Sequence, residues 1–149
     1  MNTSSNKCKH RYAGVFIITK SRKVIGQMRD YKIGIDNPGK ISTFGGSIEG
    51  DESPKTAAMR ELVTEETNLK LLIDDFHFLT RDTSRRDVLK DIEIRYFYYV
   101  LIGDDELNTM EVYEGAGWAY INSPDDPLLV DSWRKPTRLI LQMLPSIVL

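Results

Sequence analysis

The stretch GGSIEGDESPKTAAMRELVTEET, residues Gly45–Thr67, decides the fold of this 149-residue chain. It holds five glutamates and three glycines beside a single arginine. Ser53 and Pro54 are typical of the N-cap and the first position of a helix, so the stretch predicts a turn followed by a helix. The concentration of negative charge needs a physical explanation, because carboxylates close together on one helix face repel one another.

The spacing of the glutamates suggests such an explanation. On a regular α-helix Glu61 and Glu65 share one face, since they are four positions apart. A divalent cation between them would turn repulsion into attraction, and oxygen ligands favour a hard ion, Mg²⁺ or Mn²⁺. Gly45 and Gly46 allow the backbone to approach a ligand closely. The alternative, a solvated acidic helix face, does not account for these glycines.

The segments around this stretch predict a mixed sheet. A loop is predicted over residues 80–90 and a terminal helix within 132–149. Strands, one helix, further strands and a final helix predict an α/β fold with helices on both faces of the sheet. We expect a flexible tail over residues 1–10 and a single domain over residues 11–149. Apolar and β-branched runs predict strands at residues 12–19, 24–30, 71–79, 92–102 and 117–121, and residues 41–46 are a short extended segment that leads into the acidic stretch.

Composition argues against several classes of partner. The formal net charge is −2 and the pI is about 5.7, so the chain has no general attraction for nucleic acid or for an anionic membrane. The basic residues of segment 81–90 alternate with aspartates and do not form a nucleic-acid stripe. A single cysteine, Cys8, and the absence of a long apolar run predict a cytoplasmic protein.

The acidic stretch resembles the signature of the Nudix hydrolases, G-x5-E-x7-R-E-U-x-E-E-x-G-U, in which U is a bulky apolar residue. Gly46, Glu52, Arg60, Glu61 and Leu62 match it at the required separations. The resemblance implies a Nudix-type α/β/α sandwich with a mixed sheet. It also implies metal-dependent hydrolysis of a diphosphate linkage.

The match has two readings after Leu62. The chain has Val63 and Thr64 before its Glu-Glu pair, where the signature has one residue. Without a gap, Glu61 and Glu65 occupy the metal-ligand positions; with a gap, the extra residue forms a bulge and Glu65-Glu66 is the family pair. Because a regular helix turns Glu66 away from Glu61, we predict the ungapped reading.

The resemblance also implies a set of site residues. Glu61 and Glu65 are expected as principal metal ligands, with assistance from Glu49 through water and from the Gly46 carbonyl. Glu52 and Arg60 are expected to pair and support the turn. A general base is expected ahead of the strand at 117–121, where Glu111 and Glu114 are the candidates.

The implied substrate is a small nucleotide derivative. The family uses nucleoside triphosphates, nucleotide sugars, ADP-ribose and dinucleoside polyphosphates, and many of its members are homodimers. The alternative is a catalytically weak Nudix-fold domain that binds or senses a nucleotide. It is kept because Thr64 and Asn68 depart from the signature.

Overall fold

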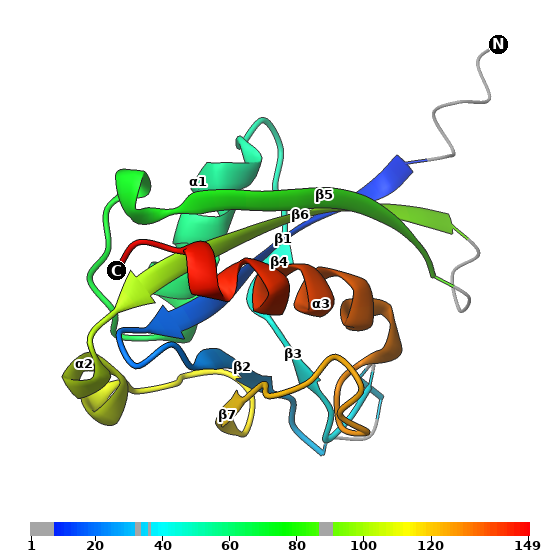
Figure 1. The fold of residues 1–149 in the computed structure, drawn as a ribbon. Helices are drawn as coiled ribbons and strands as arrows, with labels where there is room; N and C mark the ends of the chain where they lie inside the picture. The colour runs from blue at the N-terminus through cyan, green and yellow to red at the C-terminus, as the bar shows by residue number, and fades with distance from the viewer. Residues whose placement is uncertain (1–7, 32–33, 36, 87–90) are drawn as a thin grey trace, which may run out of the picture.

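The centre of the protein, in a computed structural model, is a seven-stranded mixed sheet (Figure 1). Strands β1 (Cys8–Thr19) and β6 (Asp91–Ile102) are its longest and pair in parallel. Strand β5 (His77–Arg86) runs antiparallel to β6 at one edge. This arrangement confirms the predicted mixed sheet. The structure describes residues 8–31, 34–35, 37–86 and 91–149.

The other edge of β1 is shared by two shorter strands. Strand β4 (Phe44–Ser47) pairs with the first half of β1, and β2 (Val24–Met28) pairs with its second half. Strand β2 also pairs with β3 (Ile41–Ser42) and β7 (Gly117–Tyr120), and all of these pairings are antiparallel. The glycine-rich start of the acidic stretch is therefore a strand held directly against β1.

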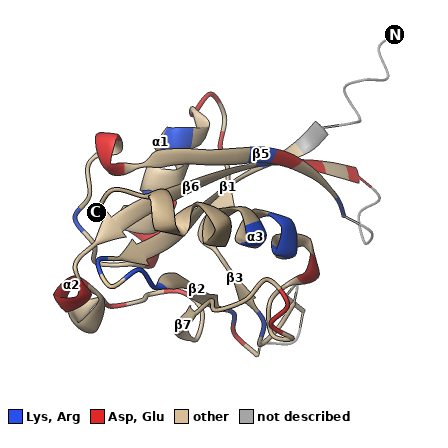
Figure 2. Ribbon diagram, in the orientation of Figure 1, with Lys and Arg blue, Asp and Glu red and all other residues tan. Residues whose placement is uncertain are grey.

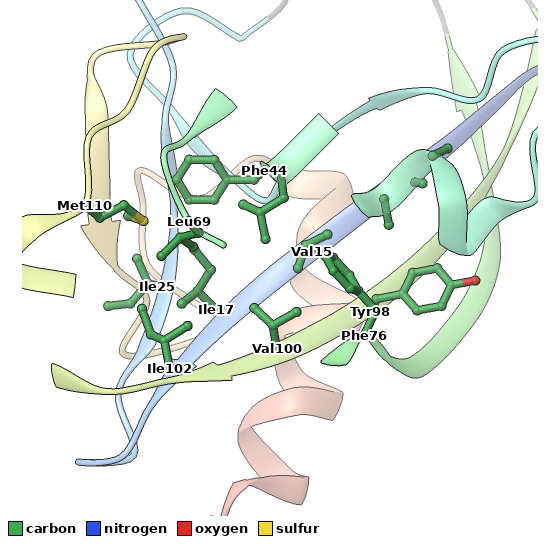
Figure 3. Packing of buried hydrophobic residues seen from close by; sticks show 14 of the residues in the cluster. Val15, Ile17, Ile25, Phe44, Leu69, Phe76, Tyr98, Val100, Ile102 and Met110 are labelled. Carbon is green, nitrogen blue, oxygen red and sulfur yellow. The ribbon is translucent and has the colours of Figure 1, made fainter. Parts of the chain in front are cut away.

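Alternate side chains of β1 cover opposite faces of the sheet. Val15 and Ile17 belong to the apolar cluster that includes Ala57 and Ala58 of helix α1 (Pro54–Met59), part of which Figure 3 shows. Phe16 and Ile18 belong to a second cluster, which packs on Ile140 of helix α3 (Arg134–Met143). The helices thus lie on both faces, as the α/β/α sandwich requires. No helix within the described residues has the length and apolar character needed to cross a membrane.

The helix of the acidic stretch changes type halfway along. It begins as predicted, with Pro54 at its start and the Ser53 hydroxyl accepting a hydrogen bond from the Thr56 backbone N–H at 3.1 Å. Residues Arg60–Glu66 then form a π-helix, η2, which the Thr67 N–H closes by donating to the Leu62 carbonyl at 3.0 Å. The prediction of a regular α-helix is therefore wrong for this half. The chain has one residue more than the signature between Leu62 and the Glu-Glu pair, and the wider π-helical turn accommodates it.

Strand β5 differs most from the sequence-based expectation. The strand predicted at 71–79 overlaps only its first residues, and the predicted loop from residue 80 is strand as far as Arg86. The alternating charged residues that indicated a loop belong to an edge strand, whose pairing with β6 fixes the backbone. Two short elements, the 3₁₀ turn η3 (Ile73–Asp75) and helix α2 (Asp104–Thr109), were not predicted.

Both ends of the chain differ from the predictions. Strand β1 already begins at Cys8, so the last residues of the expected tail belong to the sheet, and residues 1–7 lie outside the described part of the chain. The predicted terminal helix is shorter than its segment. It is preceded by the 3₁₀ turn η4 (Asp131–Trp133) and followed by η5 (Leu144–Ser146).

Candidate active site

Glu66 is a buried carboxylate at the end of η2. Its side chain is directed at strand β4, where Oε1 accepts a hydrogen bond from the Gly45 N–H at 2.7 Å. Oε2 accepts a second, longer hydrogen bond from Nε2 of Gln27 at 3.4 Å. Only a glycine fits at position 45, because a Cβ there would lie 2.2 Å from the Ala13 carbonyl oxygen. The close approach of β4 to β1 thus places the N–H that orients Glu66.

Glu61 lies against the neighbouring glycine. A Cβ at Gly46 would lie 2.5–2.6 Å from the carboxyl group of Glu61, so this glycine leaves the space that the carboxylate occupies. In a π-helix residues i and i+5 lie on the same side, as residues i and i+4 do in an α-helix. Glu66 therefore also returns to the side of Glu61, and the geometric reason for preferring Glu65 over Glu66 no longer applies.

Glu65 shares the Nη1 donor of Arg60 with Glu61, and its charge also raises the pKa of Glu61. Its side chain is 43% exposed, and its carboxylate accepts a hydrogen bond from the Arg60 guanidinium.

The carboxylates of the site disfavour one another's ionisation. Burial raises the pKa of Glu66 to about 8, and the negative charges of Glu61 and Glu114 add to this rise. The hydrogen bond from the Gly45 N–H acts in the opposite direction and lowers the pKa of Glu66. Burial also raises the pKa of Glu61, which Arg60 partly offsets. Glu61, Glu66 and Glu114, which we call the acidic site, therefore hold an excess of negative charge that a cation would relieve.

Arg60 ties the turn before α1 to η2. Its Nε and Nη2 donate to the two carboxylate oxygens of Glu52 at 2.7 and 3.0 Å, and Nη2 also donates to the Ser47 carbonyl at 3.0 Å. Its Nη1 donates to Glu61 at 2.9 Å. Hydrogen bonding to Arg60 lowers the pKa of Glu52. The expected Glu52–Arg60 pair is therefore present. Glu49, 69% exposed and 3.8 Å from Arg60, is held less firmly.

Replacing Arg60 by alanine is expected to lower both the hydrolytic rate and the melting temperature. The variant loses a two-pronged charge-assisted hydrogen bond and the contact to the Ser47 carbonyl, so the melting temperature should fall by about 5 °C. Arg60→Lys serves as the control, because it keeps the charge but not the fork. Circular dichroism melting checks the result. A loss of activity at an unchanged melting temperature would assign Arg60 to the substrate instead.

The structure separates the two candidates for the general base. The loop that carries Glu114 is held by Gln27, whose Nε2 donates to the Glu114 carbonyl at 3.0 Å, and by the Tyr113 N–H, which donates to the Glu66 carbonyl at 2.7 Å. Glu111 lies three residues earlier in the chain, where its N–H donates to the Asn68 side chain. Only Glu114 acts on the pKa values of both Glu61 and Glu66.

Gln27 was not anticipated from the sequence, although a signal exists. It is a polar residue in the otherwise apolar strand VIGQM and is only 6% exposed. A buried amide needs hydrogen-bond partners, which here are Glu66 and the Glu114 loop. A cavity of about 360 Å³ adjoins this loop and is lined by residues that include Gln27, Arg29, Tyr113 and Glu114.

The acidic site suits a cation that needs few protein ligands. Among the described residues, no group of three or more His, Cys, Asp or Glu side chains is arranged as a complete metal shell. The Glu61 carboxylate occupies the space beside Gly46 that a Cβ would fill, and the Glu66 carboxylate accepts from the N–H of the adjacent Gly45. Mg²⁺ is commonly bound by one or two carboxylates together with water and substrate phosphates. The residues present therefore fit such an ion.

Comparison with known proteins identifies the family. Residues 9–136 match the model of the NUDIX domain, so the chain belongs to the Nudix family. This assignment confirms the resemblance, the fold and the enzyme class expected from the signature, a Nudix-type pyrophosphohydrolase. Among curated protein sequences none matches the chain significantly.

Solved structures share the fold at low sequence identity. A MutT protein from Methanosarcina mazei Go1 has a TM-score of 0.71 and 16% identity, with 92% of this chain and 95% of that chain covered. A C. elegans Ap4A hydrolase has a TM-score of 0.69 and 15% identity, with 93% and 99% covered. A Francisella tularensis bifunctional NMN adenylyltransferase/ADP ribose pyrophosphatase, complexed with AMP and an Mn ion, has a TM-score of 0.64 and 17% identity, with 91% and 42% covered.

Proposed function

We propose that this protein hydrolyses the diphosphate linkage of a small nucleotide derivative with the help of a divalent cation held by Glu61 and Glu66. The observation that carries the proposal is the return of Glu66 to the side of Glu61 by the π-helical turn, with both carboxylates against Gly45 and Gly46. Burial raises the pKa of both carboxylates, and the charge of Glu61 raises that of Glu66 further, so the pair is a costly arrangement without a ligand of opposite charge.

The proposed metal site differs from the sequence-based expectation at one position. Glu61 remains a principal ligand, and Glu66 replaces Glu65 as the second. The Gly46 carbonyl and Glu49, through water, complete the proposed set, and Glu65 is left to its contact with Arg60. Oxygen donors alone favour Mg²⁺, with Mn²⁺ as the alternative. When bound, such an ion neutralises phosphate oxygens and lowers the pKa of a water molecule.

The other residues of the site have separate tasks in this proposal. Glu114 accepts the proton of the attacking water, because it is the exposed carboxylate whose loop is tied to Glu66. Glu52 holds Arg60, and Arg60 in turn orients Glu61. Gln27 positions both the Glu66 carboxylate and the Glu114 loop.

The cavity beside Glu114 is the proposed place of the nucleotide. Arg29 lines it and offers a guanidinium suited to a phosphate group, and the ring of Tyr113, 56% exposed, offers a face for stacking. The solved structures with names that include Ap4A hydrolase and ADP ribose pyrophosphatase support a nucleotide substrate. The formal net charge of −2 and the single cysteine support a small-molecule substrate and a cytoplasmic location.

A hydrolysis screen tests the proposal. Nucleoside triphosphates, nucleotide sugars, ADP-ribose and dinucleoside polyphosphates are incubated with the protein and Mg²⁺ or Mn²⁺, and released phosphate, pyrophosphate and nucleotide are measured. We expect one class to be turned over and EDTA to stop the reaction. Glu114→Gln should lower kcat roughly 100-fold, and the matched control Glu111→Gln should leave it nearly unchanged.

The alternative function is a nucleotide-binding or sensing domain with weak catalysis. One observation favours it, since Arg60 already donates to Glu61 and a cation must compete with this contact. Tight nucleotide binding with no turnover across the panel, in the presence of either metal, would establish this alternative and reject the hydrolase.

A further inference from the structure

A second, basic cavity lies at the β5 edge of the sheet, where helix α3 begins. Its volume is about 710 Å³, and β5, Arg95 of β6, η4 and the start of α3 line it. Arg95 is on the same face of β6 as Phe97, which packs with Ile140 of α3. The acidic site instead lies at η2, the continuation of α1 on the other face (Figure 1). The two sites therefore involve different elements.

The lining of the basic cavity carries more positive than negative charge. Figure 2 shows Lys and Arg on α3 and on β5. Two carboxylates line the cavity, Asp82 and Asp131, and each already has a partner there: Asp82 accepts two hydrogen bonds from Arg95 at 2.8 Å, and Asp131 pairs with Arg134 at 3.0 Å. Six cationic residues line the cavity: Arg81, Arg85, Arg95, Arg134, Lys135 and Arg138.

Four of these cationic residues have no ionic partner in the described part of the chain, and one of the four, Arg81, has an aromatic contact. The Arg81 guanidinium lies over the ring of Tyr96, 5.7 Å from its centroid. Arg85, Lys135 and Arg138 are exposed and make no ion pair with any carboxylate in the described part of the chain. The surplus of positive charge in the lining therefore resides in side chains that are free to bind a ligand.

The position of this surplus is unfavourable without an anion. Lys135 lies in the first turn of α3, where the helix dipole is positive, and the first turn contains no acidic residue. Arg95, only 2% exposed, is fixed between Asp82 and Ser132, and Asp82 offsets its charge, so the surplus lies in the other cationic side chains. Like charges gathered in this way, in a chain of net charge −2, repel one another. An anion in the cavity would reverse the sign of these interactions.

The chemistry of the lining favours phosphate groups. Guanidinium forks match phosphate oxygens in pairs, and Ser84 and Thr83 supply hydroxyl groups. Lys135 and Arg138 come from α3, whereas Arg85 of the edge strand β5 is in register with Ile92 and starts from the opposite face of the strand to Asp82 and Arg95. A ligand that reaches all three cations therefore extends round the β5 edge and needs more than one phosphate. We propose that the basic cavity binds an oligophosphate group of a ligand separate from the substrate at the acidic site.

Isothermal titration calorimetry with sodium tripolyphosphate, at low salt and in excess EDTA, tests this proposal independently of hydrolysis. The triple variant Arg85→Gln, Lys135→Gln, Arg138→Gln is expected to raise Kd roughly tenfold or more. The matched control Lys20→Gln, Lys23→Gln, Lys70→Gln removes the same charge from exposed lysines elsewhere and should change Kd less than about twofold. Equal effects of the two triple variants, or no binding by the wild type, would overturn the proposal.

Two further measurements identify the site and the class of ligand. In Glu61→Gln, tripolyphosphate binding is expected to be unchanged, whereas its loss in this variant would place the ligand at the acidic site and overturn the proposal. Tighter binding of a single-stranded oligonucleotide than of tripolyphosphate, lost in the same triple variant, would replace the proposal with a nucleic-acid surface. Failure of the hydrolysis screen leaves all of these binding results standing.

Discussion

Replacing Glu66 by glutamine is expected to lower kcat roughly 1000-fold, whereas the same replacement at Glu65 is expected to change it less than about tenfold. Glutamine keeps the size of the side chain and can still accept the Gly45 N–H, so the fold should survive. What is lost is the negative charge at the buried position beside Glu61. Glu65, already 43% exposed, gives up only its contact with Arg60.

Metal binding provides the second measurement for this pair of variants. Mn²⁺ affinity, followed by electron paramagnetic resonance, should fall at least about tenfold in Glu66→Gln and stay near the wild-type value in Glu65→Gln. Melting temperatures exclude a general loss of structure. If Glu65→Gln showed the larger loss of both turnover and Mn²⁺ affinity, the ligand role would return to Glu65. Equal losses in the two variants would contradict the assignment to Glu66 alone.

The start of this site could be predicted because its determinants are local. The Ser53 cap, Pro54 and the Glu52–Arg60 pair depend on separations of a few residues, which the sequence displays directly. The strand order could be predicted only as a class, a mixed sheet, because apolar runs do not specify their partners.

The choice between Glu65 and Glu66 depends on contacts that the local sequence does not contain. Gly45 of β4 and Gln27 of β2 both donate to Glu66, and the sheet brings these donors to the end of η2. They stabilise a wider turn that helix propensity alone would not select. For the same reason β5 was not predicted in full, since pairing with β6, rather than composition, makes segment 80–86 a strand.

Without a divalent cation, the free energy of unfolding is expected to fall as the pH rises from about 5 to 8, by roughly 2 to 4 kcal/mol from Glu66 alone. The ordinary pKa of a glutamate is 4.5, and that of Glu66 in the folded protein is about 8. Below pH 4.5 Glu66 is protonated in both the folded and the unfolded state, so it does not lower the free energy of unfolding. Between the two values only the folded state holds the proton, so the unfolded state binds fewer protons and stability decreases with pH. Above 8 the full cost is present.

Urea unfolding at a series of pH values in EDTA, for the wild type and for Glu66→Gln, measures this dependence. The variant cannot ionise at this position, so its stability should change less with pH and exceed that of the wild type near pH 8. Added Mg²⁺ should stabilise the wild type more at pH 8 than at pH 6, because the cation binds the ionised carboxylates. Parallel pH profiles of the two proteins would refute a buried, proton-holding Glu66. In the expected result, the ionised Glu66 carboxylate lowers the stability of the metal-free protein and is also required for catalysis. Glu66→Gln should therefore raise stability near pH 8 and lower turnover.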